Sequence, residues 1–373
     1  MKMLFAINVD WYFNLHWKDR LMSDMTNNFD THICYAKTKK EKENSTLNIS
    51  HVPLHRSNLS PFSNLMSIVS CIKLVNRCSP DIIHSVTIKP NLFFGFIARL
   101  KNIPILITIV GLGSIFSSNT IKYRLLQKVI LLLYRFVGKG KCHFIFENLE
   151  DQQAFFINKI CTNQNSSIAP GAGIDLAVFK PSSDHKADDG LINVLFASRL
   201  LYGKGLEDLI DAVETLNLQC KRFRLNVAGI IDNESIDAIP KSNIEKWHKQ
   251  GKIHWLGRCN DMPQLLTQSN IVALPTTYSE GLPRILLEAA ACARPTIATD
   301  TPGCNHLIKN GYNGLLVKPK NITQLVRAID CYANRDLRIL HGKRSRKVIE
   351  ENFTTEHVIK SYKKAYQKLK EIK

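Results

Sequence analysis

Two glutamates in the second half of the chain have the residue type and the spacing to hold a polar ligand. Glu280 lies in a short loop, and Glu288 follows eight residues later within the apolar run 283–292. Pro283 suits the first turn of a helix, because its missing N–H would have no intrahelical acceptor there. The pattern therefore predicts a helix over 283–292 and a strand over 296–299, with Glu280 just ahead of the helix and Glu288 inside it.

This separation favours an extended ligand over an adjacent acid pair. Eight residues of helical rise put the two carboxylates roughly 12 Å apart, too far to act on one atom. Two acceptor groups at that distance suit a ligand with hydroxyls at both ends and charge between them, such as a sugar nucleotide whose diphosphate lies at a helix start. Spacing alone also fits one exposed loop glutamate and another on a helix face, so other residues must decide.

A cationic turn, Ser198 to Gly205, directly follows a predicted strand over 192–197 and precedes a predicted helix over 206–216. Arg199 can bind an anion bidentately, Lys204 supplies a point charge, and the glycines allow close backbone approach. The turn therefore predicts a phosphate site, with a solvated basic loop as the alternative. The first turns of the two halves lack G-x-G-x-x-G, which disfavours a dehydrogenase. The chain contains no Asp-x-Asp, which disfavours a metal-dependent sugar transferase.

The stretch around the two glutamates resembles the Glu-x7-Glu signature of the family-four retaining glycosyltransferases. Ala293 and Arg294 depart from it, since relatives often carry a glycine before the proline. The resemblance implies the GT-B architecture, in which two Rossmann-like doubly wound α/β domains face each other across a cleft. The residues that match are Glu280, Gly281, Pro283, Leu287, Glu288, Ala289, Pro295 and Gly303.

The same resemblance implies roles for individual residues. Catalytic roles fall to Glu280, beside the donor sugar, and to Arg199 and Lys204, which replace a metal at the leaving diphosphate. Glu288 would accept hydrogen bonds from the ribose. The implied donor-binding residues are Glu288, Gly281, Leu282, Gly205 and Arg258.

Short apolar runs alternate with amphipathic runs in both halves, which predicts a parallel, doubly wound sheet in each. A chain of 373 residues fits two domains, and the Gly-, Pro- and charge-rich stretch 170–190 predicts the boundary near 180. We expect an acceptor- and membrane-facing domain over 1–180 and a nucleotide-sugar domain over 181–373. In GT-B enzymes a C-terminal helix crosses back to the first domain, which the sequence of 322–373 does not itself show.

Loops of the first half are candidates for acceptor binding. Gly111, Gly113 and Ser114 follow a predicted strand and would let a sugar or phosphate approach the backbone, or form a plain glycine turn. Residues 8–16 are predicted to form a loop that contains His16. Both loops resemble those of a subgroup that adds N-acetylhexosamine or hexose to undecaprenyl-diphosphate-linked sugars. His84, within a strand, is expected in the core.

The chain is strongly basic, with a net charge of +18, which points to an acidic partner. Residues 117–146 contain no acid, and 121–141 predict a basic amphipathic helix suited to an anionic leaflet, or a packed helix with a solvated basic face. No nucleic-acid motif accompanies the charge, so no nucleic-acid partner is expected. Ten cysteines without a C-x-x-C pair indicate reduced thiols in the cytosol.

These observations favour a cytoplasmic enzyme, peripheral to the inner face of the cytoplasmic membrane, that moves a hexose or N-acetylhexosamine from a UDP-sugar to a lipid-linked saccharide. Such a reaction belongs to the assembly of O-antigen, capsule or other bacterial surface glycans. We expect retention of configuration, no metal and no cofactor. The alternatives are a non-catalytic module that binds anionic membrane or nucleic acid, and a UDP-sugar epimerase of the same fold.

Overall fold

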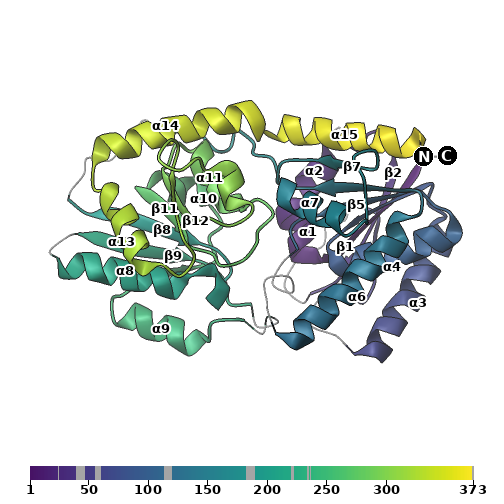
Figure 1. Cartoon of the computed structure of the whole chain (residues 1–373), viewed down its shortest axis with the longest axis horizontal. Helices are drawn as coiled ribbons and strands as arrows, with labels where there is room; N and C mark the ends of the chain where they lie inside the picture. The colour runs from purple at the N-terminus through teal and green to yellow at the C-terminus, as the bar shows by residue number, and fades with distance from the viewer. Residues whose placement is uncertain are drawn as a thin grey trace. The chain divides into compact units, whose positions relative to one another are not determined.

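The computed structural model describes residues 1–23, 25–38, 47–54, 60–112, 120–181, 190–219, 222–232, 235 and 237–371, apart from the side chain of Lys122. They form two compact units, Met1–Pro170 with Thr355–Lys373, and Gly171–Thr354. Each unit contains a parallel sheet with helices packed on it (Figure 1). The predicted α/β class, with two Rossmann-like doubly wound units, is confirmed.

The sheet of the first unit has the strand order β3-β2-β1-β4-β5-β6-β7, and all its pairs are parallel. The chain runs outward from β1 to β2 and β3, then returns to the other side of β1, so the switch point lies between β1 and β4. Buried, β-branched and aromatic residues fill the central strands, as expected for a sheet covered on both faces. The strands are β1 (Lys2–Val9), β2 (Asp30–Ala36), β3 (Ile49–His51), β4 (Ile82–Val86), β5 (Ile105–Ile109), β6 (Cys142–Phe146) and β7 (Ser166–Ile168).

Two hydrophobic cores cover the two faces of this sheet. One core packs side chains of α3 (Pro61–Cys78), α4 (Ile88–Lys101), α6 (Ile121–Gly138) and α7 (Leu149–Ile157). The other packs α1 (Asp10–His16), α2 (Lys18–Met22) and the C-terminal helix α15 (Thr355–Glu371). His84 lies in the second core, with Nδ1 2.7 Å from Tyr366 Oη and Nε2 2.9 Å from Thr108 Oγ1. His84 is fully buried, so the prediction that it lies in the core is confirmed, and burial lowers its pKa to about 3.

The sheet of the second unit has the order β10-β9-β8-β11-β12-β13 and is also parallel. Its switch point lies between β8 and β11. The strands are β8 (Ile192–Ala197), β9 (Phe223–Ala228), β10 (His254–Gly257), β11 (Ile271–Leu274), β12 (Thr296–Thr299) and β13 (Leu315–Val317).

Helices connect these strands and enclose one continuous hydrophobic core. A short 3-10 turn, η1 (Tyr202–Lys204), follows β8. The α-helices are α8 (Leu206–Leu218), α9 (Lys241–Lys249), α10 (Met262–Thr267), α11 (Arg284–Ala291), α12 (Cys304–Leu307), α13 (Ile322–Cys331) and α14 (Arg335–Asn352). Among the described residues of both units, no helix has the length and apolar composition needed to cross a membrane.

The structure moves the domain boundary from the predicted position near 180 to Pro170/Gly171. The segment after Gly171 packs on the second unit, because Ile174 N donates to Phe353 O at 2.9 Å and Phe179 is buried in that unit's core. The chain then returns to the first unit at Thr355, so α15 belongs with 1–170 and not with 181–373.

The predicted loop over residues 8–16 is wrong, because Asp10–His16 forms helix α1 directly after β1. The carboxylate of Asp10 accepts from Trp11 N at 2.7 Å and from Thr38 N at 2.6 Å. Negative charge in the first turn stabilises a helix, and the bond to Thr38 fixes its start beside β2. His16 therefore lies in the last turn of a helix.

Candidate active site

The candidate site lies at the switch point of the second unit. Strands β8 and β11 are neighbours there, and the connections that leave their carboxyl ends run in opposite directions. Lys204 follows β8, and residues 276–280 follow β11. Ligands of open α/β sheets bind where such loops diverge. The topology thus brings together two motifs that the sequence separates by more than seventy residues.

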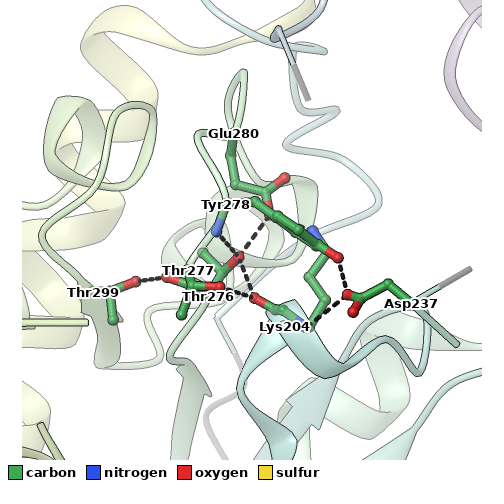
Figure 2. A network of polar contacts seen from close by, with 8 residues as sticks. Lys204, Asp237, Thr276, Thr277, Tyr278, Glu280 and Thr299 are labelled. Carbon is green, nitrogen blue, oxygen red and sulfur yellow. Dashed lines mark hydrogen bonds and ion pairs between the residues drawn. The ribbon is translucent and has the colours of Figure 1, made fainter. Parts of the chain in front are cut away.

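Lys204 and Glu280, two of the predicted catalytic residues, are in direct contact. Lys204 Nζ donates to Glu280 Oε1, and Thr276 Oγ1 lies 3.0 Å from the same oxygen (Figure 2). Both charged side chains are largely buried, with Lys204 8% exposed. The pair places a cation, which can bind phosphate, beside an acceptor oxygen, which can bind hydroxyls.

Backbone contacts hold the Lys204 turn against the loop after β11. Thr277 N donates to Gly203 O at 2.8 Å. Gly205 has a φ of +79°, and a Cβ built on it would lie 2.1 Å from Pro275 O. Only glycine fits this position without a backbone shift. Gly205, predicted to bind the donor, therefore also sets the distance between the two loops.

Asp237 and Tyr278 add a second link, which the sequence analysis missed. Tyr278 Oη donates to Asp237 Oδ2, which also accepts from Gly203 N at 2.9 Å (Figure 2). Lys204 Nζ lies 5.7 Å from the centre of the Tyr278 ring, within cation–π range. Burial and the Asp237 carboxylate raise the pKa of the Tyr278 phenol, so it remains a hydrogen-bond donor at neutral pH.

Arg199, the third predicted catalytic residue, contacts a different carboxylate. Its Nη1 donates to Asp232 Oδ2 at 2.8 Å, and its side chain is about one-third exposed. Its positive charge acts on the Tyr278 phenol and opposes the rise of that pKa. Arg199 and the Lys204 turn are thus both held by acids of the loop after β9, Asp232 and Asp237. No sequence motif had pointed to these two acids.

Glu288 is buried inside α11 and paired with Arg284. Arg284 Nε donates to Glu288 Oε1 at 2.7 Å, one helical turn apart. Burial raises the pKa of Glu288, and the Arg284 guanidinium opposes that rise. The sequence analysis also missed Arg284. Its position four residues before Glu288 in a predicted helix would have predicted an ion pair between the two side chains.

The start of α11 differs from the prediction. Pro283 is the N-cap, with φ −61° and ψ 116°, and the helix begins at Arg284. Glu280 to Pro283 are not helical, so the estimate of the separation from helical rise does not apply. Gly303 fixes this loop instead, because its Cβ would lie 2.1 Å from Gly281 O, and Glu280 N donates to Pro302 O at 3.2 Å.

The remaining predicted donor-binding residues lie in different surroundings. Gly281 is buried in the Glu280 loop, and Leu282 is 6% exposed in the hydrophobic core. Arg258 is exposed after β10, which β9 separates from β8. Their donor contacts stay predictions.

The predicted acceptor loops belong to the first unit. His16 is half-buried at the end of α1, with its ring 4.5 Å from that of Tyr12. Gly111 follows β5 with a φ of +105°, a conformation that favours glycine. Gly113 and Ser114 lie outside the described residues. In the described part of the chain, no three His, Cys, Asp or Glu side chains are grouped to share a metal ion.

Comparison with known proteins defines the class. Residues 180–352 match the family model of glycosyl transferases group 1, and residues 2–147 match that of glycosyl transferase 4-like proteins. The fold resembles that of the Anabaena protein HepE, solved with UDP-glucose, at a TM-score of 0.77 and 17% identity over 98% of this chain and 99% of that one. The fold is that of GT-B glycosyltransferases.

Two relatives of the chain are named as transferases that act on sugars linked to diphosphoundecaprenol. The chain is 30% identical to the N,N'-diacetylbacillosaminyl-diphospho-undecaprenol alpha-1,3-N-acetylgalactosaminyltransferase of Campylobacter jejuni, over 72% of each protein. It is 25% identical to the UDP-Gal:alpha-D-GlcNAc-diphosphoundecaprenol alpha-1,3-galactosyltransferase of Escherichia coli, over 74% of this chain and 73% of that protein. The chain belongs to the group 1 glycosyltransferases.

Proposed function

We propose that this enzyme transfers a hexose or N-acetylhexosamine, with retention of configuration, from a UDP-sugar to a saccharide linked to a lipid diphosphate. The Lys204–Glu280 pair at the switch point of the second unit carries the proposal. It supplies a positive charge for a diphosphate and a carboxylate for sugar hydroxyls within one hydrogen bond. Two relatives named for diphosphoundecaprenol-linked acceptors support the acceptor class.

In the proposed reaction, the hydroxyl oxygen of the acceptor bonds to the anomeric carbon of the donor. The bond from that carbon to the diphosphate oxygen breaks, and its electron pair leaves with UDP. Lys204 and Arg199 stabilise the charge that develops on the diphosphate. Attack from the face that the diphosphate leaves gives retention, and the departing oxygen takes the proton of the acceptor hydroxyl.

Glu280 and Glu288 have separate positioning roles in this scheme. Glu280, held by Lys204 and near Thr276, accepts from hydroxyls of the donor sugar. Glu288, held by Arg284, accepts from the ribose of UDP. No step requires a metal or another cofactor, because the two cations act where a metal otherwise would.

The acceptor sets the place of the reaction. A lipid-linked saccharide stays in the bilayer, while UDP-sugars are made in the cytoplasm, so we place the enzyme at the inner face of the cytoplasmic membrane. The basic helix within 121–141 would contact anionic lipid there. Products of this kind are intermediates of O-antigen, capsule or related surface glycans.

A thermal-shift screen over UDP-, GDP- and ADP-sugars tests the donor class. We expect UDP-sugars alone to raise the melting temperature, and a response to GDP- or ADP-sugars instead would contradict the proposal. Release of UDP only when a diphosphoundecaprenol-linked sugar is added excludes the epimerase, which needs no acceptor. Binding to vesicles or DNA that UDP does not affect, without UDP release, would favour the non-catalytic module.

A further inference from the structure

Helix α3 of the first unit exposes apolar side chains along its solvent side. They recur at intervals of three, one and three residues, so they lie on one face of the helix. The opposite side of α3 packs into the core of the unit through Cys71, Leu74 and Val75. The exposed side chains are Phe62, Leu65, Met66 and Val69.

Helix α6 repeats this arrangement over its whole length. Ile130, Tyr134 and Val137 are buried in the same core, while the solvent side is apolar as well. The helix thus has apolar side chains toward solvent as well as toward the core, and a large exposed apolar area is unusual on a surface that water alone covers. The exposed side chains are Ile121 (88%), Leu125 (66%), Val129, Leu132 (66%), Leu133 and Phe136.

Helix α4 lies between the other two and joins their stripes. It contacts both α3 and α6, and the three helices are seen side by side in Figure 1. Phe96 and Leu100 of α4 are exposed, and the rings of Phe96 and Phe136 are 5.7 Å apart. Because all three helices cover one face of the sheet, their solvent sides belong to one surface, here called the three-helix face.

The charge of the three-helix face has a single sign. The sequences of α3, α4 and α6 contain no aspartate and no glutamate. Arg99 also stacks over Phe136, with its guanidinium 5.8 Å from the ring centre. Long cationic side chains of this kind keep their charge in water while their stems cover apolar surface. The exposed cations on these helices and at their ends are Lys73, Arg77, Arg99, Lys101, Arg124, Lys128, Arg135 and Lys139.

We propose that the three-helix face docks on an anionic lipid bilayer and inserts its apolar side chains into the interface. The inference rests on the proposed function for the reason to be at a membrane, and extends it by naming the surface and the mode of contact. Contact through the cations alone would be adhesion by charge, which salt screens. The exposed apolar side chains of α3, α4 and α6 add a hydrophobic contribution to the free energy of membrane binding, which salt does not screen.

The charge selects the bilayer over a second copy of this chain. Two three-helix faces brought together would oppose cations to cations at every border, with no acids on these helices to pair with them. An anionic leaflet supplies the opposite charge around an apolar interior. The same cations would therefore repel a copy and attract the bilayer.

Vesicle binding by the full chain tests the proposal. Leu125→Gln with Leu132→Gln removes two leucines that are each 66% exposed, and the matched control is Val178→Gln with Leu218→Gln, at 53% and 87% exposure in the second unit. On phosphatidylglycerol-containing vesicles, we expect the α6 pair to weaken partition about tenfold and the control pair to change it little. Raising the salt should weaken binding of the unchanged chain without abolishing it.

Equal losses from the two pairs, or complete release by salt, would overturn the proposal. So would a dimer in solution that only the α6 pair dissociates, since the face would then bind a second copy. A parallel assay with a water-soluble, short-chain diphosphate-linked acceptor separates the two proposals. Unchanged transfer with lost vesicle binding supports the face, whereas vesicle binding without any UDP release would contradict the proposed function alone.

Discussion

Lys204 and Glu280 form an ion pair between two loops whose residues lie 76 positions apart in the sequence. The pair explains why a cationic turn after one strand and a glutamate signature after another belong to one site. Each residue also restrains the other, because Lys204 donates to the oxygen that lies beside Thr276. A diphosphate that binds Lys204, or a donor sugar that binds Glu280, would therefore have to replace part of the contact between these two residues.

Glu280→Gln should separate anion binding from sugar transfer. The change removes the counter-charge of Lys204, so we expect inorganic pyrophosphate to bind about tenfold more tightly, equivalent to about 1.4 kcal/mol. Transfer should fall, because an amide orients the sugar hydroxyls less well than a carboxylate. Titration calorimetry measures the first effect and UDP release the second.

The control for this variant is Glu214→Gln, which removes the partner of Lys252 from an ion pair of 2.8 Å in the same unit. It should change neither quantity. Weaker binding of pyrophosphate to Glu280→Gln would mean that Glu280 does not restrain Lys204.

Glu288 should give UDP binding a distinctive dependence on pH. Burial raises its pKa above the ordinary 4.5, so the ionised acceptor is lost at a higher pH than for an exposed glutamate. As pH falls through the raised pKa, affinity for UDP should decline, and Glu288→Gln should abolish that decline. Calorimetry across pH 4.5 to 8 provides the measurement.

Arg284 should control the position of this decline. Removing its guanidinium in Arg284→Ala leaves burial unopposed, so the pKa of Glu288 rises further and the loss of UDP affinity moves to higher pH. Arg284→Lys keeps a positive charge, so it should move the loss of UDP affinity only part of the way to higher pH. An unchanged pH profile in Arg284→Ala would show that Arg284 has no influence on how Glu288 binds UDP.

Gly205 and Gly251 provide a matched pair for the geometry of the site. Both have a φ in the left-handed region, +79° and +72°, but only Gly205 has a backbone oxygen where a Cβ would be. Gly251→Ala should cost about 1–2 kcal/mol of unfolding free energy from the backbone alone. Gly205→Ala should cost about 1–3 kcal/mol more and weaken UDP binding, because it displaces the Lys204 turn. Chemical denaturation and calorimetry check both; equal costs would contradict the close packing.

At Ala293, in contrast to Gly205, we expect a change to glycine to stabilise the protein. It has a φ of +54° just after α11, at one of the two positions where the sequence departs from the resembled signature, so an L-residue has a left-handed conformation there. Ala293→Gly should stabilise the protein by about 0.5–1 kcal/mol after the entropy of the unfolded chain is counted. Ala290→Gly, inside the same helix, should instead destabilise it by about 1 kcal/mol or more. Thermal melts measure the stability of both variants. A loss of stability in Ala293→Gly would show that the backbone of Ala293 is not strained.

Much of the fold was readable from the sequence because strands in covered parallel sheets are short apolar runs. The strands over 192–197 and 296–299 have the predicted bounds. The short edge strand β3 and helix α1 were missed, since three residues give no periodicity and α1 starts directly from β1. The boundary was misplaced because Gly171 to Phe179 has the composition of a linker but packs on the core of the second unit.

The site was only partly readable. Motifs identified Lys204, Glu280 and Glu288, and helical spacing could have added Arg284. Asp232, Asp237 and Tyr278 could not be found in this way, because their partners come from loops that only the strand order brings together. The sequence thus indicates which groups do chemistry, whereas the contacts that position them depend on tertiary structure.

The rate of sugar transfer from a UDP-sugar to a diphosphoundecaprenol-linked saccharide, in unchanged protein and in Lys204→Ala and Glu288→Gln, tests the central claim most directly. We predict that Lys204→Ala lowers the rate about 10²–10³-fold, the usual effect of losing one group that stabilises developing charge. Glu288→Gln should lower it through weaker UDP binding, while Lys252→Ala should leave it unchanged. Transfer at the unchanged rate in both site variants would contradict the assignment of this site.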